Sequence, residues 1–185
     1  MLIAVAVACL LIYCYHGHMS AQPTIPATLP DVPILAYTAG LLDGEGSIQI
    51  NGAKNGTEGG RSYWTLSVQI CSVGEDFLEG VRARWHNIGA ITYSKSRGSR
   101  AGRTIRNWRL YSAQAEWFLA AILPYLRLKQ EQARIALEFR QYVAPRKNWL
   151  TPERLEQRER LALEMRALNA RTGKGLGARK SVGVF

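Results

Sequence analysis

The chain contains few of the residues that build disulfide frameworks and zinc sites. Its 185 residues include only three cysteines and three histidines, and their spacing matches neither kind of framework. We interpret Cys71 as a small apolar filler. Free thiols are typical of reducing intracellular compartments. We therefore expect an organelle or a bacterial or phage cytoplasm, and the sequence does not say which.

Acidic residues are scarce as well. The chain has 24 lysines and arginines against 14 aspartates and glutamates, which gives a net charge of +10. Between Arg82 and Arg109 there are eight basic residues and no acid, and Tyr93 and Trp108 lie within that run. A solvated face is the simplest explanation of a charge run. A run of this length without an acid favours nucleic acid over an acidic small molecule as the partner.

A hydrophobic run long enough to span a membrane is missing too. Residues 1–15 are almost all apolar, but a membrane span needs about 20 residues, and a secretory signal begins with positive charge. A weak anchor, a fused upstream exon, a mistaken start before Met19 and an extra helix all remain open explanations. We expect residues 1–31 to be dispensable and the protein to form no stable membrane association.

The composition is otherwise that of one folded domain. Hydrophobic residues make up 47% of the chain and charged residues 21%, which argues against global disorder. The length is sufficient for one hydrophobic core. We place this domain at residues 32–170 and a basic tail at residues 171–185.

The stretch at residues 38–47, Thr-Ala-Gly-Leu-Leu-Asp-Gly-Glu-Gly-Ser, is the most informative part of the chain. An apolar helix over residues 34–42 leads into Asp43 and Glu45. The helix dipole disfavours an acid at a C-terminus by a few tenths of a kcal/mol. The acids therefore suggest a compensating cation, most simply a divalent metal. The alternative is a glycine C-cap followed by two acids in an exposed turn.

Small residues recur along one face of this helix. Ala36, Gly40 and Gly44 stand four residues apart, a spacing that places them in one row. Such a row lets a second backbone approach closely. A helix that packs against a copy of itself brings two Glu45 carboxylates together. The chain contains no second copy of the motif, so we expect it to need a twin.

Alternation and helical spacing predict an α+β fold of order α-β-β-α-β-β-α with additional helices. The expected elements are a helix at 34–42, strands at 47–51 and 61–70 around a turn at 52–60, a helix at 74–88, strands at 90–96 and 103–111 around a turn at 97–100, and helices at 113–123, 128–142 and 151–169. The two hairpins are expected to form one curved four-stranded antiparallel sheet, with helices on one face and polar side chains on the other.

Three strings resemble the LAGLIDADG homing endonucleases, in the branch with one motif per chain. They are residues 38–47, residues 93–99 ending in Arg-Gly-Ser, and Leu-Arg-Leu-Lys-Gln-Glu-Gln-Ala at residues 126–133. The resemblance covers about residues 33–170. It implies the αββαββα LAGLIDADG homing-endonuclease-like fold and a homodimer that binds double-stranded DNA.

The resemblance also implies roles for particular residues. Glu45 is expected to be the catalytic, metal-binding acid, with the Gly44 carbonyl as a second ligand of Mg²⁺ (or Mn²⁺), and Lys129 is expected near the scissile phosphate. Asp43 is expected to be a structural residue at the helix end. The implied dimer interface consists of Ala36, Ala39, Gly40, Asp43 and Gly44. Relatives often carry Gln and Arg after the second strand, where this chain has Ile70 and Gly74; Gln69 and Ser72 are the nearest candidates.

One face of the predicted sheet carries polar side chains suited to the major groove, because Arg pairs with guanine and Asn or Gln with adenine. The expected DNA-binding residues are Gln49, Asn51, Arg61, Tyr63, Thr65, Ser67, Gln69, Lys95, Arg97, Asn107 and Arg109. We expect a site-specific double-strand DNA endonuclease of homing type, acting on a long, partly palindromic site. An RNA-splicing maturase that binds intron RNA on the same fold is one alternative. A non-catalytic DNA-binding regulator is another.

Overall fold

The computed structural model describes residues 25–54, 62–74, 76–95, 102–143 and 151–177. The elements in chain order are α1 (Val32–Glu45), β1 (Gly46–Lys54), β2 (Ser62–Ser72), α2 (Phe77–Arg84), β3 (Ala90–Lys95), β4 (Thr104–Tyr111), α3 (Ser112–Ile122), the 3-10 helix η2 (Leu123–Tyr125), α4 (Gln130–Gln141) and α5 (Pro152–Gly177). The α+β class and the αββαββα order predicted from the sequence are confirmed. Among the described residues, no helix has the length and apolar character needed to cross a membrane.

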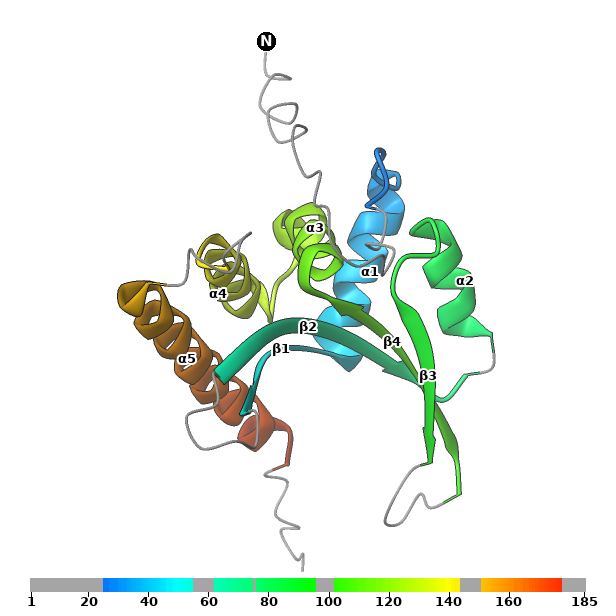
Figure 1. Ribbon diagram of the computed structural model, residues 1–185. Helices are drawn as coiled ribbons and strands as arrows, with labels where there is room; N and C mark the ends of the chain where they lie inside the picture. The colour runs from blue at the N-terminus through cyan, green and yellow to red at the C-terminus, as the bar shows by residue number, and fades with distance from the viewer. Residues whose placement is uncertain (1–24, 55–61, 75, 96–101, 144–150, 178–185) are drawn as a thin grey trace, which may run out of the picture.

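The four strands form one antiparallel sheet in the order β1-β2-β4-β3. The sheet is strongly curved, and the helices lie on its convex side (Figure 1). Strand alternation explains this layering, because successive side chains point to opposite faces. The apolar set faces the helices and is buried: Ile48, Ile50, Leu66, Val68, Ile70, Trp108 and Leu110. No helix formed by the described residues covers the opposite, concave face, which is called here the open face.

A cluster of aromatic rings fixes the helices to the sheet. Trp85 packs against Trp108, Trp117 and Phe118, with ring centroids 4.6 to 6.4 Å apart. The Trp85 indole N–H donates to the Thr38 hydroxyl at 3.0 Å, and the Trp108 indole N–H donates to the Ile88 carbonyl at 2.9 Å. Both buried indoles therefore have a hydrogen-bond partner, as buried tryptophans require. The cluster joins α1, α2, α3 and β4.

The longest helix, α5, packs against the edge strand β1 and also contacts β2. Its Asn169 amide donates to the Ile48 carbonyl at 2.9 Å, and its Arg158 guanidinium donates to the Trp64 carbonyl at 3.1 Å. Arg158 is buried, and burial lowers its pKa, with further lowering from nearby Arg140. The guanidinium also lies 5.6 Å from the centre of the Phe139 ring. Arg158 therefore links α5 both to α4 and to the sheet.

The bounds of most elements differ from the sequence prediction by a few residues, and three of these differences have a structural meaning. β1 continues through Gly52, which was expected to begin a turn; a Cβ at that position would lie 2.8 Å from the Trp64 ring, so this glycine serves packing. α2 is shorter than expected, because His86 and Asn87 adopt positive φ angles that end the helix. α5 continues to Gly177, beyond the expected end at residue 169. The turn expected at 97–100 lies outside the described residues.

Gly89 connects α2 to β3 and can be tested against a matched glycine. Its φ of +70° is unfavourable for other residues, and an added Cβ would lie 2.4 Å from the Arg109 carbonyl. Gly89→Ala should lower the free energy of unfolding by about 1–3 kcal/mol. Gly80→Ala, within α2 and with open space around it, should raise it by about 0.5–1 kcal/mol. Urea denaturation of both variants measures this; equal stabilities would contradict the assignment of backbone strain at Gly89.

Candidate functional site

The end of α1 passes directly into β1, and this junction positions Glu45. Glu45 is the last residue of α1, and Gly46 is the first of β1. The Gly46 N–H donates to the Leu42 carbonyl, and a Cβ at Gly46 would lie 2.3 Å from the Leu42 side chain. Only glycine therefore allows the chain to turn so tightly. The Glu45 side chain is exposed, and it makes no hydrogen bond or ion pair with the described part of the chain.

The other acid of the motif has a different role. The Asp43 carboxylate accepts hydrogen bonds from two backbone amides, that of Arg127 at 2.7 Å and that of Lys129 at 2.9 Å. These amides lie immediately before α4, where a carboxylate is favoured by the helix dipole and by unpaired N–H groups. Asp43 therefore joins the end of α1 to the beginning of α4. Its carboxylate is used within the protomer, whereas that of Glu45 is free.

Lys129 lies at the same junction. Its ammonium group donates to the carbonyl of Asp43. Burial lowers the pKa of Lys129, and the nearby carboxylates of Asp43 and Glu45 act in the opposite direction. The ammonium is thus within electrostatic reach of the Glu45 carboxylate. The structure brings together the two residues for which the sequence predicted a catalytic role, although 84 positions separate them in the chain.

The small-residue row on α1 is only partly as predicted. Ala36, Gly40 and Gly44 are exposed, and a Cβ at either glycine would meet no atom within 4 Å. Ala39, by contrast, is fully buried within the protomer. Its predicted place in a dimer interface is therefore wrong, because position 39 points to the core, whereas the row containing Gly40 points outward.

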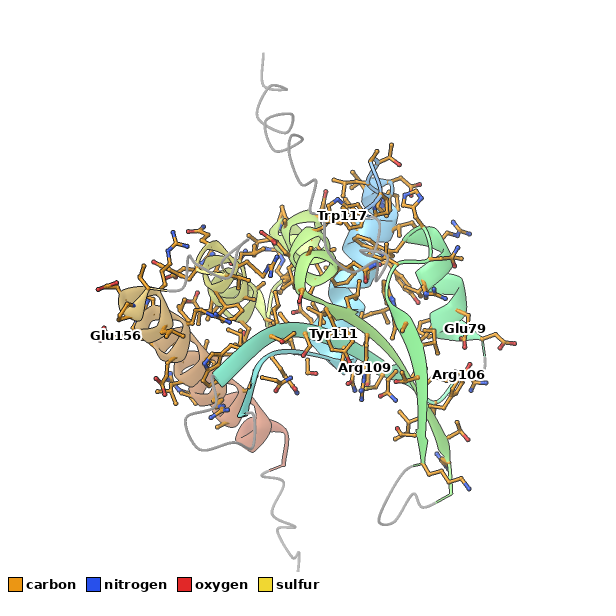
Figure 2. The ribbon with its side chains drawn as sticks, in the orientation of Figure 1. Glu79, Arg106, Arg109, Tyr111, Trp117 and Glu156 are labelled. Carbon is orange, nitrogen blue, oxygen red and sulfur yellow. The ribbon has the colours of Figure 1, made fainter. Side chains whose placement is uncertain are left out.

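The open face of the sheet carries most of the polar residues predicted for it. Register pairs Gln49 with Ser67, Asn51 with Thr65, and Gln69 with Arg109, so these side chains share a face. Figure 2 draws Arg109 and Tyr111 along the concave side. Tyr63 lies in β2 opposite Ala53, but its side chain is not among those described. Arg61 and Arg97 lie outside the described residues. The predicted DNA contacts themselves stay predictions.

Two predicted DNA-binding residues are corrected by the structure. Lys95 pairs with Thr104 and alternates with Tyr93 and Ile91, so it lies on the helix-side face of the sheet. A register shift of one residue near a turn reverses the face of every side chain, which the sequence alone did not resolve. Asn107 does lie on the open face, but only 3% of its surface is exposed. Its amide is held by neighbouring strands and is not free to meet a base.

Asn107 belongs to a cluster that the sequence did not reveal. Its Oδ1 atom accepts from the Gln69 amide at 2.9 Å and from the Cys71 thiol at 3.2 Å, and Gln69 Nε2 also donates to the Cys71 sulfur at 2.8 Å. The interpretation of Cys71 as an apolar filler is therefore wrong. Alternation along β2 places Cys71 on the same face as Gln69, and that signal was available in the sequence.

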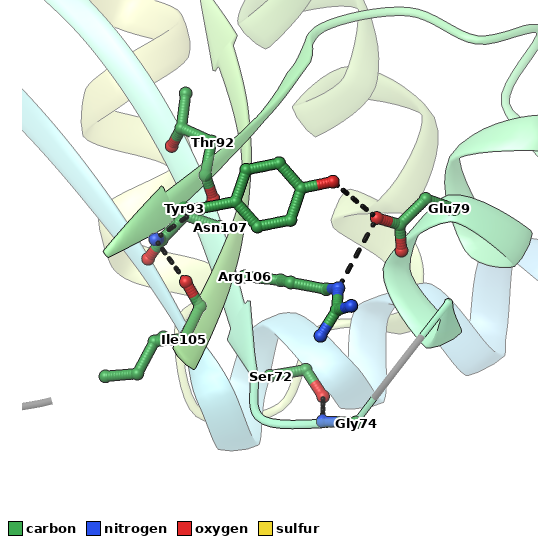
Figure 3. A network of polar contacts seen from close by, with 8 residues as sticks. All are labelled: Ser72, Gly74, Glu79, Thr92, Tyr93, Ile105, Arg106 and Asn107. Carbon is green, nitrogen blue, oxygen red and sulfur yellow. Dashed lines mark hydrogen bonds and ion pairs between the residues drawn. The ribbon is translucent and has the colours of Figure 1, made fainter. Parts of the chain in front are cut away.

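Part of the basic run is used to build the fold. Arg106 forms an ion pair with Glu79 of α2 at 3.6 Å and lies 5.6 Å from the centre of the Tyr93 ring, while the Tyr93 hydroxyl donates to Glu79 at 3.3 Å (Figure 3). Arg82 donates to the carbonyls of Asn87 and Ile88 at the end of α2. These two arginines attach α2 to its surroundings. Arg109, on the open face, retains that possibility.

No protein-family model and no curated protein matches the sequence. Solved structures do match. The homing endonuclease I-CvuI, crystallised with a DNA target and Mg, is 19% identical, with a TM-score of 0.59 over 72% of this chain and 80% of that chain. The archaeal intron-encoded homing endonuclease I-Vdi141I, complexed with DNA, is 18% identical, with a TM-score of 0.58 over 72% of this chain and 82% of that chain.

A third structure, the LAGLIDADG homing endonuclease I-GzeII in complex with its DNA target, is 18% identical. Its TM-score is 0.55 over 73% of this chain but only 43% of that chain, so this chain corresponds to less than half of it. The chain thus has the fold of the LAGLIDADG homing endonucleases, as the motif at residues 38–47 indicated.

The junction of α1 and α4 can be tested through Asp43. Asp43→Ala should lower the free energy of unfolding by about 1–3 kcal/mol, because two backbone amides lose a charged acceptor. Asp43→Asn should lower it less, since one amide oxygen remains. Asp31→Ala is the control: Asp31, at the other end of α1, is exposed and makes no side-chain capping bond, so a change within about 0.5 kcal/mol is expected. Thermal and urea unfolding compare the three; equal losses at both positions would contradict the capping role.

Proposed function

We propose that this chain is a site-specific double-strand DNA endonuclease of homing type, acting as a homodimer with Mg²⁺ or Mn²⁺. The observation that carries the proposal is the junction at the end of α1. There an unpaired, exposed carboxylate lies within reach of a partly buried ammonium, those of Glu45 and Lys129. The fold extends a concave polar sheet face from the same point. A protein that only binds DNA has no need of an acid facing phosphates.

The oxygen atoms at this junction suit a divalent metal. Mg²⁺ in nucleases is held by one or two carboxylates together with oxygens of the substrate phosphate. The described residues contain no group of three or more His, Cys, Asp or Glu side chains that could enclose an ion. One protomer thus offers the Glu45 carboxylate and the Gly44 carbonyl, and the remaining ligands would come from DNA and from the twin Glu45. When bound, the metal activates water and stabilises the leaving 3′ oxygen.

Lys129 supplies fixed positive charge at the same place. Its ammonium is held by the Asp43 carbonyl, so the group is oriented before any phosphate arrives. A preorganised cation in a partly buried site stabilises developing negative charge better than a mobile one. We assign to Lys129 the stabilisation of charge on the phosphate, and to Asp43 the positioning of Lys129.

The exposed row on α1 supports the homodimer. A glycine within an exposed helix costs about 1 kcal/mol relative to alanine, and α1 carries two, Gly40 and Gly44, at which an added Cβ would meet no atom within 4 Å. Close approach of a second α1 gives both glycines a packing role. The two Glu45 carboxylates then lie near one another, one for each DNA strand. A partly palindromic target follows from the two-fold symmetry of such a dimer.

The proposed dimer predicts that a larger side chain on the exposed row of α1 prevents dimerisation. Gly40→Leu should hold the two helices apart and convert the protein to folded monomers, because the added side chain fills the space that the twin backbone would occupy. The control is Gly80→Leu, an exposed glycine in α2 that also has open space around it, which should leave the dimer intact. Light scattering at micromolar concentration gives the mass. A wild-type monomer that still cuts both strands in concert would contradict the proposal.

Glu45→Gln separates a nuclease from a DNA-binding regulator. The substitution keeps the shape of the side chain but removes the charge that recruits the metal, so cleavage should fall below detection. Stability should hold or rise by a few tenths of a kcal/mol, because an acid leaves the unfavourable end of a helix dipole. The experiment selects duplexes from a random library, then measures plasmid cleavage in Mg²⁺ and gel shifts in Ca²⁺ on the selected site.

The matched control for this experiment is Glu153→Gln, which neutralises an exposed carboxylate in the first turn of α5 and should leave cleavage unchanged. A Glu45→Gln variant that cuts at the wild-type rate would remove Glu45 from the mechanism. A wild type that binds its selected site and never cuts it would instead favour the regulator. Selection of intron RNA in place of duplex DNA would favour the maturase.

A further inference from the structure

The orientation of one open-face amide is fixed by its neighbours. Asn107 Nδ2 lies 3.4 Å from the Thr92 carbonyl and 3.3 Å from the Ile105 carbonyl (Figure 3), and 3.2 Å from the Ser94 hydroxyl. Carbonyl oxygens only accept hydrogen bonds. The nitrogen of the Asn107 amide must therefore face them, since the reverse orientation would oppose oxygen to oxygen. Its Oδ1 atom is consequently turned toward β2.

This orientation determines that of Gln69. The Asn107 Oδ1 atom lies 2.9 Å from the Gln69 amide nitrogen, and an oxygen at that distance would be repelled. The same nitrogen lies 2.8 Å from the Cys71 sulfur, while the Cys71 thiol donates to Asn107 Oδ1. The nitrogen end of the Gln69 amide is thus held within the sheet, and the nitrogen carries the only donors of that amide.

The remaining polar atom of Gln69 is its Oε1 oxygen. This atom accepts no hydrogen bond from the described part of the chain, and it is not among the buried polar atoms that lack a partner there. It therefore faces solvent on the open face, beside Arg109 on the adjacent strand. Gln69 therefore presents its oxygen, a hydrogen-bond acceptor, to the open face, while its nitrogen is turned toward Asn107.

Presentation of this oxygen has a defined consequence in the major groove. Adenine and cytosine present an amino donor there, at N6 and N4, whereas guanine and thymine present acceptors. We infer that Gln69 reads amino bases, adenine or cytosine, and discriminates against the keto bases guanine and thymine on the contacted strand. Asn107, with Cys71, is the positioning residue that imposes this preference. The inference rests on the proposed function and adds to it the class of base that this position selects.

The test selects preferred duplexes from a random library with the full-length protein in Ca²⁺. Gln69→Leu identifies the contacted position as the one whose preference disappears, and Gln49→Leu, an exposed glutamine on the same face, serves as the control that should affect a different position. At the Gln69 position the wild type should favour adenine and cytosine over guanine and thymine by about tenfold. Equal tolerance of all four bases, or a preference for keto bases, overturns the inference.

Substitutions at and beneath Gln69 test the cause of the preference. Gln69→Lys presents donors only and should reverse the preference to guanine and thymine. Asn107→Ala releases the Gln69 amide and should relax the preference at this one position by about tenfold, with the other positions unchanged. A uniform loss of affinity for every sequence would mean that Asn107 is merely structural. Thermal unfolding verifies that each variant is folded, and Gln69→Lys, on the open face, keeps the test decisive if Asn107→Ala is unstable.

The outcomes distinguish the two proposals. A protein that selects no duplex at all contradicts the proposed function and, with it, this inference. A protein that selects and cuts a defined site but shows no amino preference at the Gln69 position retains the proposed function and loses only the inference. If the preference for amino bases survives in Asn107→Ala, some other contact orients the Gln69 amide. That result contradicts the positioning role of Asn107.

Discussion

The carboxylate of Asp43 accepts the backbone amides of Arg127 and Lys129, and the arrangement of the candidate site depends on this contact. It attaches the end of α1 to the beginning of α4, which brings the Lys129 ammonium to the carbonyl of Asp43 and within reach of Glu45. The same contact leaves the Asp43 carboxylate, one of the two acids of the motif, fully engaged in hydrogen bonds within the protomer. The two acids, separated by one residue, therefore have unlike environments and can serve different purposes: one holds the fold and the other remains free for a cation.

The open face shows a similar division. Some of its polar residues hold neighbouring side chains in place, and others expose their polar groups to solvent. Asn107 is buried and has its amide fully engaged, whereas Gln69 offers a single oxygen to solvent. Arg106 and Arg82 hold α2, whereas Arg109 remains on the concave side. A count of basic or polar residues along the sequence overstates what a DNA duplex could meet. Pairing within the sheet removes some of these groups from the surface and fixes the orientation of others.

Periodicity was sufficient for much of the fold. Alternation in residues 64–70 identified the buried side of β2, and the motif at residues 38–47 indicated the fold that solved structures share with this chain. The predicted position of a residue was wrong where the sequence allowed two structural roles for that residue. Gly52 was expected in a turn but admits the Trp64 ring. Lys95 lies near a turn, where a shift of one residue changes the face. Ala39 and Gly40 are neighbours in sequence, yet one is buried and the other exposed.

The sequence by itself determined the order of elements, the apolar face of the sheet and the small-residue row on α1, because each follows from the period of a single helix or strand. It also pointed to Glu45 and Lys129 through local strings. Only the tertiary structure decided that Lys129 lies near Glu45, that the Asp43 carboxylate accepts the amides before α4, and that the amides of Asn107 and Gln69 are hydrogen-bonded to each other. Those outcomes depend on hydrogen bonds between segments that lie 38 and 86 residues apart, and no local pattern in a chain specifies which distant amide will meet which carboxylate.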